Sequence, residues 1–251
     1  MATQDETARP LYIQLLQNCV SNNIYRNDVN LGYWSRDTPV TDEQRQMGLV
    51  WPSCAHTMVG LQRLGNVAFC VEDVLKHNIP GDLIETGVWR GGCCILMRGI
   101  LKAYGDTTRK VFVADSFEGL PPPTWSQDAG DDHSTHNAQL AVSIEQVKEN
   151  FRRYDLLDDQ VVFLKGFFKD TLPTAPIQSL AVLRLDGDMY ESTMQALDAL
   201  YPKLSVGGYC IVDDYTLPRC AAAIHDYRQR HGIQDLIVPI DRSSVYWKKT
   251  K

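Results

Sequence analysis

The sequence predicts one α/β domain built on a mostly parallel sheet with helices on both faces. Short apolar runs alternate with segments of helical length along residues 83–230, a pattern typical of βαβ units. The last two apolar runs are separated by residues 241–244 only, a gap of hairpin length. The chain has no internal repeat and no Gly/Ser linker that would mark a domain boundary.

Seven strands are expected, the last two forming an antiparallel C-terminal hairpin. They lie at residues 83–86, 111–114, 161–164, 180–185, 209–212, 236–240 and 245–248. The intervening helices are expected at residues 91–104, 143–154, 190–204 and 219–230. Ser143, with Gln146 three residues later, predicts a capping box at the start of the second helix.

Two irregular segments are expected to lie over this sheet. Residues 21–54 are polar and rich in turn residues, so residues 1–60 are expected to form a helical and irregular cover ahead of a globular unit over 61–251. Residues 119–137 have no periodic apolar pattern and are long for a connection, as lids and binding loops often are. We call these segments the cover (1–60) and the lid (119–137), and expect the lid to shape a substrate pocket.

Composition excludes several classes of protein. With 44% hydrophobic residues the chain is an ordinary globular one, and its net charge of −6 disfavours a general nucleic-acid binder. The seven cysteines show no zinc spacing and no Cys-x-x-Cys, so reduced thiols are expected. The N-terminus is polar and acidic, and no apolar run approaches the ~20 residues that span a bilayer. We therefore expect a cytoplasmic protein without a membrane partner.

Acidic residues follow four of the expected strands. Glu85, Asp115, Asp186 and the pair Asp213-Asp214 stand at or just after strand ends. A single Asp there commonly starts a turn or caps a helix, so one alone would mean little. In open α/β sheets, however, ligands bind beyond the carboxyl ends of the strands. Four acidic strand ends therefore predict a site at this edge.

The turn after the first strand points to a nucleoside cofactor. Residues 85–92 form a glycine-rich strand-to-helix turn, where backbone N–H groups approach a ligand. A dinucleotide fingerprint would need a glycine where Trp89 stands. S-adenosylmethionine has no pyrophosphate and is less affected by this tryptophan. Asp115 follows at a spacing suited to accepting hydrogen bonds from ribose hydroxyls of either cofactor.

The acids of the later strands point to a hard cation. Asp186, Asp213 and Asp214 form an all-oxygen set, which suits Mg²⁺ or Ca²⁺ rather than zinc or copper. A cation there would activate a substrate hydroxyl, with Asp186 accepting its proton. Alternation along the strand would point Asp188 away from Asp186.

Four motifs resemble one known family. Residues 85–92 (Glu-Thr-Gly-Val-Trp-Arg-Gly-Gly), 114–119, 185–190 and 211–215 closely resemble the macrocin O-methyltransferase family, over about residues 55–247. These bacterial class I enzymes use S-adenosylmethionine to methylate sugar hydroxyls on antibiotics, and they are dimeric or larger. The resemblance implies their Rossmann-like fold, a homodimer or higher homo-oligomer, and a deoxysugar acceptor made in secondary metabolism.

The resemblance also implies roles for individual residues. The methionine tail would be held by Glu85 and the Gly87 turn under Thr57 and Met58, and the ribose by Asp115 beside Ser116. The segment from Gly166 to Phe168 would surround the adenine, with Phe168 as the stacking surface. Mg²⁺ would be bound by Asp186, Asp213 and Asp214, with Asp186 as the catalytic base.

Other interpretations stay open at this point. The acceptor hydroxyl could belong to a catechol, a polyketide or a peptide, and a non-catalytic nucleoside-binding protein would keep the glycine turn and Asp115. A nicotinamide dehydrogenase is disfavoured by Trp89, and a phosphatase built on Asp186 and Asp188 by the three βα units that precede them. His133 and His136 are expected to be solvated loop residues. His56 could border the cofactor, and Cys93-Cys94 are expected to be packing residues.

Overall fold

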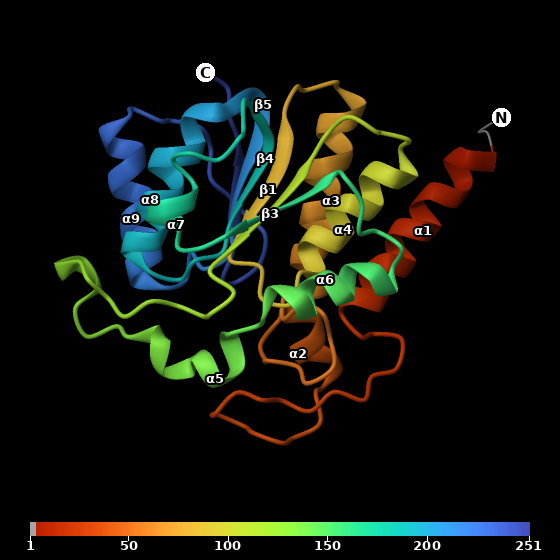
Figure 1. Cartoon of the computed structure of the whole chain (residues 1–251), viewed down its shortest axis with the longest axis horizontal. Coiled ribbons are helices and arrows are strands. Elements are labelled where there is room, and N and C mark those ends of the chain that lie inside the picture. The colour runs from red at the N-terminus through yellow and green to blue at the C-terminus, as the bar shows by residue number, and fades with distance from the viewer. Residues whose placement is uncertain (1–3) are drawn as a thin grey trace.

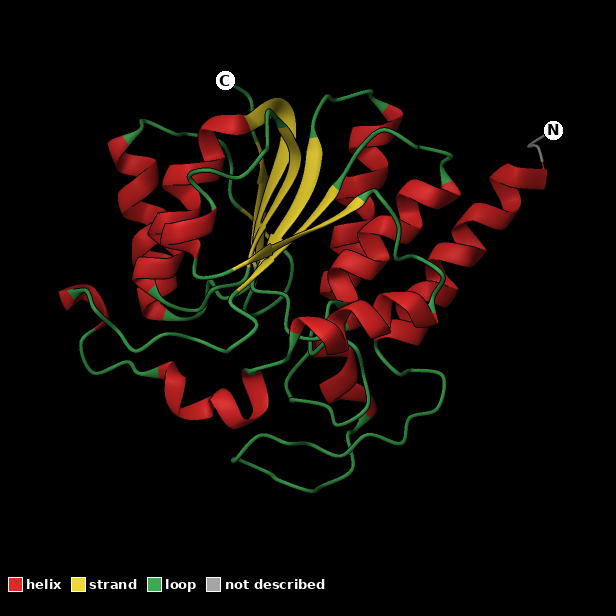
Figure 2. Ribbon diagram, in the orientation of Figure 1, coloured by secondary structure: helices red, strands yellow, loops and turns green. Residues whose placement is uncertain are grey.

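The computed structural model describes residues 4–251, and in it one seven-stranded sheet is enclosed by helices (Figures 1 and 2). The strand order is β3-β2-β1-β4-β5-β7-β6. The strands are β1 (Asp82–Thr86), β2 (Val111–Asp115), β3 (Val161–Lys165), β4 (Leu180–Leu185), β5 (Leu204–Val212), β6 (Val238–Pro239) and β7 (Val245–Lys248).

The helices cover both faces of the sheet, which confirms the predicted layers. The α-helices are α1 (Gln4–Val20), α2 (Asp42–Met47), α3 (Leu61–Lys76), α4 (Gly92–Ala103), α5 (Asn137–Leu140), α6 (Ile144–Arg153), α7 (Phe168–Thr171), α8 (Tyr190–Leu200) and α9 (Pro218–Arg230). Three 3-10 turns are η1 (Ser126–Asp128), η2 (His133–His136) and η3 (Tyr201–Lys203). In Figure 1, α1, α3 and α4 lie on one side of the sheet, and α7, α8 and α9 on the other.

Strand pairing also agrees with the sequence-based expectation. The first five strands pair in parallel, and β7 pairs antiparallel with both β5 and β6. Chain order reverses between β1 and β4, which are neighbours in the sheet. Ligands of open α/β sheets bind in the crevice at such a switch point.

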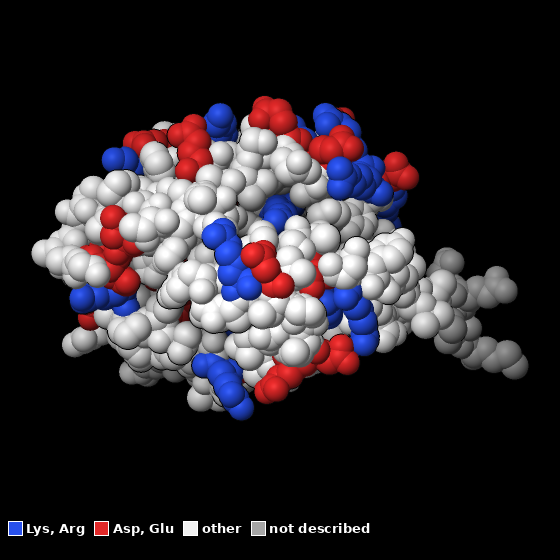
Figure 3. All heavy atoms as spheres, turned by 90° about the horizontal axis from the view of Figure 1, so that it is seen from below, with Lys and Arg blue, Asp and Glu red and all other residues white. Residues whose placement is uncertain are grey.

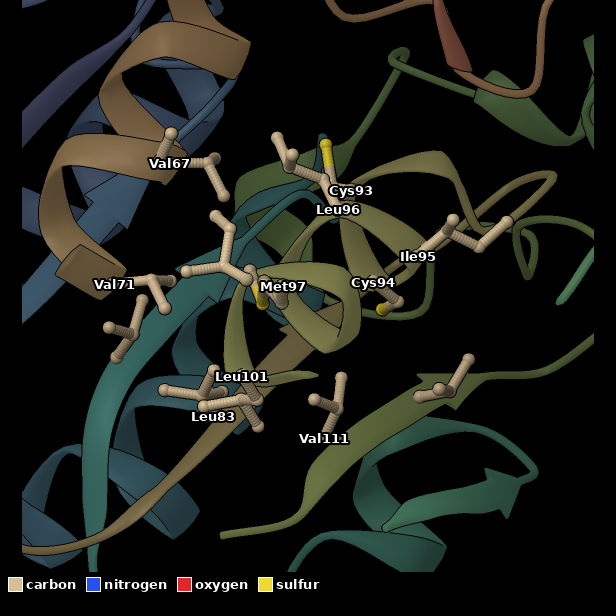
Figure 4. Packing of buried hydrophobic residues seen from close by; sticks show 14 of the residues in the cluster. Val67, Val71, Leu83, Cys93, Cys94, Ile95, Leu96, Met97, Leu101 and Val111 are labelled. Atoms are coloured by element: carbon tan, nitrogen blue, oxygen red, sulfur yellow. The ribbon is translucent and has the colours of Figure 1, made fainter. Parts of the chain in front are cut away.

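The core on the α3/α4 side is packed from apolar strand and helix residues. Leu83 of β1 and Val111 of β2 lie close to Leu101 of α4, with Met97 facing α3 (Figure 4). All four side chains are fully buried. Burying such a side chain stabilises the fold by roughly 1.5–3 kcal/mol, so this layer holds the β1 turn in place.

Several element boundaries differ from the expectation. The helix expected at 190–204 ends at Leu200, because Pro202 lies in a 3-10 turn and β5 already begins at Leu204. The strand expected at 236–240 is reduced to two residues at the sheet edge, where Pro239 lacks an N–H to donate.

Capping and helix content also differ in detail. Ser143 accepts a hydrogen bond from the Gln146 N–H as expected, but the Gln146 side chain donates to Asn150 and the capping box is only half formed. A complete capping box lies instead at Thr41 and Gln44, at the start of α2. Helix α3 was not expected at all.

The cysteines form no disulfide bond in the described part of the chain. Cysteines 19, 54, 70, 93, 94, 210 and 220 are all free, and Cys93 and Cys94 are buried in the core. Across residues 4–251, no helix is both long and apolar enough to cross a membrane.

Candidate active site

A cavity of about 430 Å³ opens at the carboxyl ends of the central strands, between the cover and the lid. The acids of four strands line it, as the sequence predicts. These acids are Glu85, Asp115, Asp186, Asp213 and Asp214. The face that carries the cover and the lid is mostly uncharged when seen from below (Figure 3).

Nearly all predicted site residues line this cavity. Besides the acids, the lining includes Thr57, Met58, Gly87, Ser116 and Phe168. Gly166 is the exception. Its φ of 141° makes the turn after β3, where a Cβ would meet Thr171 at 2.8 Å, while Phe167 and Phe168 reach the cavity.

The β1 turn needs its glycine for a steric reason. Gly87 has φ of 84°, and a Cβ there would lie 1.7 Å from the backbone oxygen of Asp186. The turn therefore brings the backbone of β1 against the acid end of β4. Trp89 also has a positive φ of 47°, and its indole N–H donates to the Gln139 carbonyl at 2.9 Å. This tryptophan joins the turn to the segment that follows the lid.

Asp115 braces the same turn through backbone hydrogen bonds. Its Oδ2 accepts from the Val88 N–H at 2.8 Å, and its Oδ1 from the Phe117 N–H at 2.7 Å. Burial raises the pKa of Asp115, and these backbone donors partly offset the shift. The Ser116 hydroxyl also lies 3.4 Å from Oδ1, whereas Oδ2, with two lone-pair sites, retains capacity toward a ligand.

One buried arginine organises the acids of β1, β4 and β5. Arg184, on β4, is fully buried and donates through Nη1 to Glu85 at 2.5 Å and to Asp186 at 2.6 Å. Its Nη2 donates to Asp213. Arg184 was not among the residues predicted for the site. Its signal in the sequence is a lone charge within the apolar run Leu180–Leu185, because a charge buried there needs partners of opposite sign.

A second arginine reaches Asp213 from α3. Nη1 of Arg63 lies 2.7 Å from Oδ2 of Asp213, and its Nε lies 2.7 Å from Oδ2 of Asp241. Arg63 is 8% exposed, and its own guanidinium pKa is raised, its two carboxylate partners outweighing its burial. Asp213 is thus held by two guanidinium groups, whereas the Asp214 carboxylate accepts, from the residues that the structure describes, only a long 3.3 Å bond from the Asp188 N–H.

Asp186, Asp213 and Asp214 form a candidate cation site. Each offers an oxygen within 4.8 Å of the others. Burial, with repulsion from Asp213, raises the pKa of Asp186, and burial with repulsion from Asp188 and Asp186 raises that of Asp214. The cluster carries more carboxylates than Arg63 and Arg184 neutralise. An all-oxygen set with surplus negative charge fits Mg²⁺.

Asp188 does not point away from this cluster as alternation would require. Strand β4 ends at Leu185, and Asp188 adopts a left-handed φ of 59°. The strand rule therefore no longer applies at this position, and Asp188 lines the same cavity. Burial raises its pKa, with His133 acting in the opposite direction.

Both lid histidines are pocket residues, contrary to the expectation of solvated loops. His133 and His136 line the cavity, with Trp51 from the cover. His56 does not line it, and its Nδ1 lies 2.7 Å from the Tyr154 hydroxyl.

Comparison with known proteins identifies the family of this chain. A family model described as macrocin-O-methyltransferase matches residues 9–249. The chain belongs to the macrocin-O-methyltransferase family. It is therefore an O-methyltransferase, and the resemblance read from its motifs is confirmed.

Relatives within the macrocin-O-methyltransferase family match almost the whole chain. An 8-demethyl-8-(2,3-dimethoxy-alpha-L-rhamnosyl)-tetracenomycin-C 4'-O-methyltransferase of Streptomyces olivaceus is 54% identical, covering 98% of this chain and 95% of that protein. A demethyldecarbamoylnovobiocin O-methyltransferase of Streptomyces niveus is 51% identical, covering 100% and 97%. The solved structure of the O-methyltransferase NovP has a TM-score of 0.91 at 51% identity, covering 97% of this chain and 100% of that one.

Proposed function

We propose that this macrocin-O-methyltransferase family member uses S-adenosylmethionine and Mg²⁺ to methylate a deoxysugar hydroxyl of a glycosylated antibiotic. One observation carries the proposal. A glycine turn with its ribose-type acid, from β1 and β2, shares a single cavity with the all-oxygen acid set of β4 and β5. The first pair suits a nucleoside, and the second suits the activation of an oxygen.

The cofactor half of the site lies over β1 and β2. When bound, S-adenosylmethionine supplies an electrophilic methyl carbon next to a positive sulfonium. Glu85 with the Gly87 turn faces its amino-acid tail, under Thr57 and Met58. Asp115 beside Ser116 accepts from the ribose hydroxyls. Phe168 offers a ring to the adenine in the segment after β3, where Gly166 makes the turn.

The acceptor half lies over β4 and β5. When bound, Mg²⁺ supplies positive charge that favours the deprotonated form of a nearby hydroxyl. Asp186, Asp213 and Asp214 hold it, and Asp186 accepts the hydroxyl proton. Arg184 holds the Asp186 carboxylate through Oδ2, so Oδ1 remains for the cation and for the acceptor proton. The rate comes from aligning the oxygen with the methyl carbon while the lid excludes water.

The names of the relatives support a sugar as acceptor. The tetracenomycin enzyme is named for a rhamnosyl 4'-hydroxyl, and its sequence is 54% identical to this chain. A family member of this similarity is expected to act on a related hydroxyl.

We propose further that the chain works as a homodimer or larger homo-oligomer in the cytoplasm, with residues 1–60 covering a transferase unit over 61–251. Leu11 and Leu15 on α1 are 64% and 53% exposed and lie one turn apart, an apolar pair suited to a second copy. Sedimentation of the full chain tests this, and a monomer at micromolar concentration would contradict it.

The experiment that tests the activity uses S-adenosylmethionine labelled with deuterium in its methyl group. The protein is incubated with a panel of rhamnosides and rhamnosyl antibiotics, and products are analysed by mass spectrometry and NMR. We expect the labelled methyl group on a sugar oxygen. Label transferred only to a phenol of the aglycone, or to nitrogen or carbon, would contradict the proposal.

A further inference from the structure

Four aromatic rings from the cover and the lid form one cluster. Tyr33 stacks on His136 with ring centroids 5.2 Å apart and an interplanar angle of 9°. Trp34 meets Tyr33 edge-on at 5.2 Å, and Trp51 meets Trp34 at 5.1 Å and His136 at 5.5 Å. We call these four residues the aromatic cluster. It joins segments about 100 residues apart in the chain.

The aromatic cluster stands at the mouth of the cavity. All four rings line the cavity, and Tyr33 and Trp34 are 73% and 47% exposed, next to Leu49 at 41%. In contrast, Asp213 at the floor is 5% exposed. Exposed apolar rings that continue into a cavity are typical of a ligand groove.

The cover holds its part of the cluster in place before any ligand binds. Asn30 is fully buried, and its Oδ1 accepts from the N–H groups of Gly32 at 2.9 Å and Trp51 at 3.0 Å. Its Nδ2 donates to Ser35 at 2.8 Å. One buried amide therefore fixes the backbone around both tryptophans.

The ring of Trp34 packs against the backbone of this loop. It lies on Gly32, where an added Cβ would meet Cη2 of Trp34 at 2.6 Å. Rigid rings bind with less loss of conformational entropy than mobile ones. The aromatic cluster is therefore ordered before a ligand binds.

The size of the cavity indicates which part of the acceptor reaches the aromatic cluster. At about 430 Å³ it lies at the small end of the range of ~300–1,000 Å³ for ligand pockets, yet it must take a cofactor and an acceptor sugar. The reacting hydroxyl must meet the acids at the floor. Whatever is attached to the sugar therefore extends outward to the mouth and onto the rings.

We propose that the acceptor carries a flat aromatic aglycone, which stacks on Tyr33 and Trp34 of the aromatic cluster while its sugar enters the cavity. This inference rests on the proposed function, because it takes the acceptor to be a glycoside. Aromatic faces prefer offset or edge-to-face contact with other aromatic rings, and Tyr33 offers its exposed ring surface even while stacked on His136. The largely uncharged face around the cover and the lid fits an uncharged aglycone (Figure 3).

The test compares three glycosides that share one sugar, namely phenyl, cyclohexyl and methyl α-L-rhamnoside. Calorimetry of each against the full chain with S-adenosylmethionine and Mg²⁺ measures affinity, and initial rates measure kcat/KM. We expect the phenyl glycoside to bind about tenfold tighter than the cyclohexyl one, because stacking adds to apolar contact. The preference should appear in KM and not in kcat.

Variants assign the preference to the rings. Tyr33→Leu and Trp34→Leu should reduce the phenyl preference to about twofold or less, while Tyr33→Phe and Trp34→Phe retain it. Tyr25→Leu is the matched control, since Tyr25 is 81% exposed and does not line the cavity. The affinity for methyl rhamnoside should not change in any of these variants.

The outcomes separate this inference from the proposed function. Equal affinity for phenyl and cyclohexyl glycosides, or a preference that survives both leucine variants, would overturn the aglycone inference even if methyl transfer occurs. A phenyl preference that Tyr33→Leu or Trp34→Leu removes supports the inference. If this preference appears in calorimetry without any methyl transfer, the proposed function fails and the aromatic site stands.

Discussion

Nη1 of the fully buried Arg184 lies 2.6 Å from Oδ2 of Asp186, whose side chain is 24% exposed where it meets the cavity. The same nitrogen lies 2.5 Å from Oε1 of Glu85, so one guanidinium connects the acid proposed for the cofactor tail with the proposed base. Hydrogen bonds between a guanidinium and a carboxylate are charge-assisted, and they are short and directional. The two halves of the site therefore share one positioning residue.

Replacing Arg184 tests this connection. Removing one partner of a buried ion pair typically costs about 3–5 kcal/mol, because the other charge is left unpaired. We expect Arg184→Met to lower the free energy of unfolding by that amount, measured by urea denaturation. Arg184→Lys should be milder in stability but still lower kcat/KM, since an ammonium cannot hold three carboxylates in the same geometry. A methionine variant within about 1 kcal/mol of wild type, which is the size of the extrapolation error, would contradict the network.

Asp214 offers the cleanest test of the cation site. It lacks an arginine partner among the ion pairs of the described residues, so Asp214→Asn should leave the fold intact. We expect it to raise the Mg²⁺ concentration for half-maximal rate by at least about tenfold, in line with the loss of one ligand charge. Asp213→Asn should do the same and also lower thermal stability, because Arg63 and Arg184 lose a carboxylate. Neither variant should change the affinity for S-adenosylmethionine. A weakened cofactor affinity in Asp214→Asn would contradict the division of the site into a cofactor half and an acceptor half.

Substitution of Asp115 should lower the affinity for S-adenosylmethionine without changing the Mg²⁺ dependence. Asp115→Ala removes the carboxylate proposed for the ribose and the acceptor of the Val88 and Phe117 N–H groups. We expect a loss of affinity of at least about tenfold for S-adenosylmethionine by calorimetry, since hydrogen bonds to charged groups contribute about 1.5–3 kcal/mol. Mg²⁺ dependence at saturating cofactor should be that of wild type. Unchanged cofactor affinity would refute the ribose assignment.

The lid is anchored by Asp128, which is fully buried. Its two oxygens accept from the N–H groups of Tyr190 and Glu191, each at 2.8 Å, at the start of α8. Asp128→Ala removes this cap and should cost about 1–3 kcal/mol of stability. We expect KM for the acceptor to rise while cofactor affinity stays within about twofold, because α8 follows the Asp186 turn on the acceptor side. Gln127→Ala, at an exposed lid position that does not line the cavity, is the control. An acceptor KM that does not move in Asp128→Ala would separate the lid from acceptor binding.

His56 gives the fold a pH dependence outside the cavity. Burial, together with Arg153 and Arg90, lowers the pKa of His56 to about 4. In the unfolded chain the ordinary value near 6.5 applies, so the unfolded state binds more protons between these pH values. Stability is therefore expected to fall by roughly 1–3 kcal/mol as pH drops from 6.5 to 4. His56→Gln should flatten this part of the curve in urea unfolding, whereas His225→Gln should not. Equal slopes in wild type and His56→Gln would contradict the assignment.

The strand-end acids could be predicted because sheet topology brings successive carboxyl ends to one edge, whatever lies in between. Arg184 and Arg63 could not be paired with them in advance, since the two arginines come from β4 and α3 and their partners stand at the ends of three strands and in the turn before β7. The aromatic cluster could not be predicted either, because its residues come from segments far apart in the chain. Tyr33 and His136 meet only because the cover and the lid cross the same edge of the sheet. Asp188 was placed wrongly because a left-handed residue ended the alternation.

The proposed methyl transfer depends most directly on the acid set of β4 and β5 acting through a divalent cation. The measurement that tests it is the initial rate of methyl transfer to phenyl α-L-rhamnoside at saturating S-adenosylmethionine, before and after EDTA and on back-titration with Mg²⁺. We predict that EDTA abolishes transfer without loss of fold by circular dichroism, and that Mg²⁺ restores it. A full rate in the presence of EDTA would contradict the account.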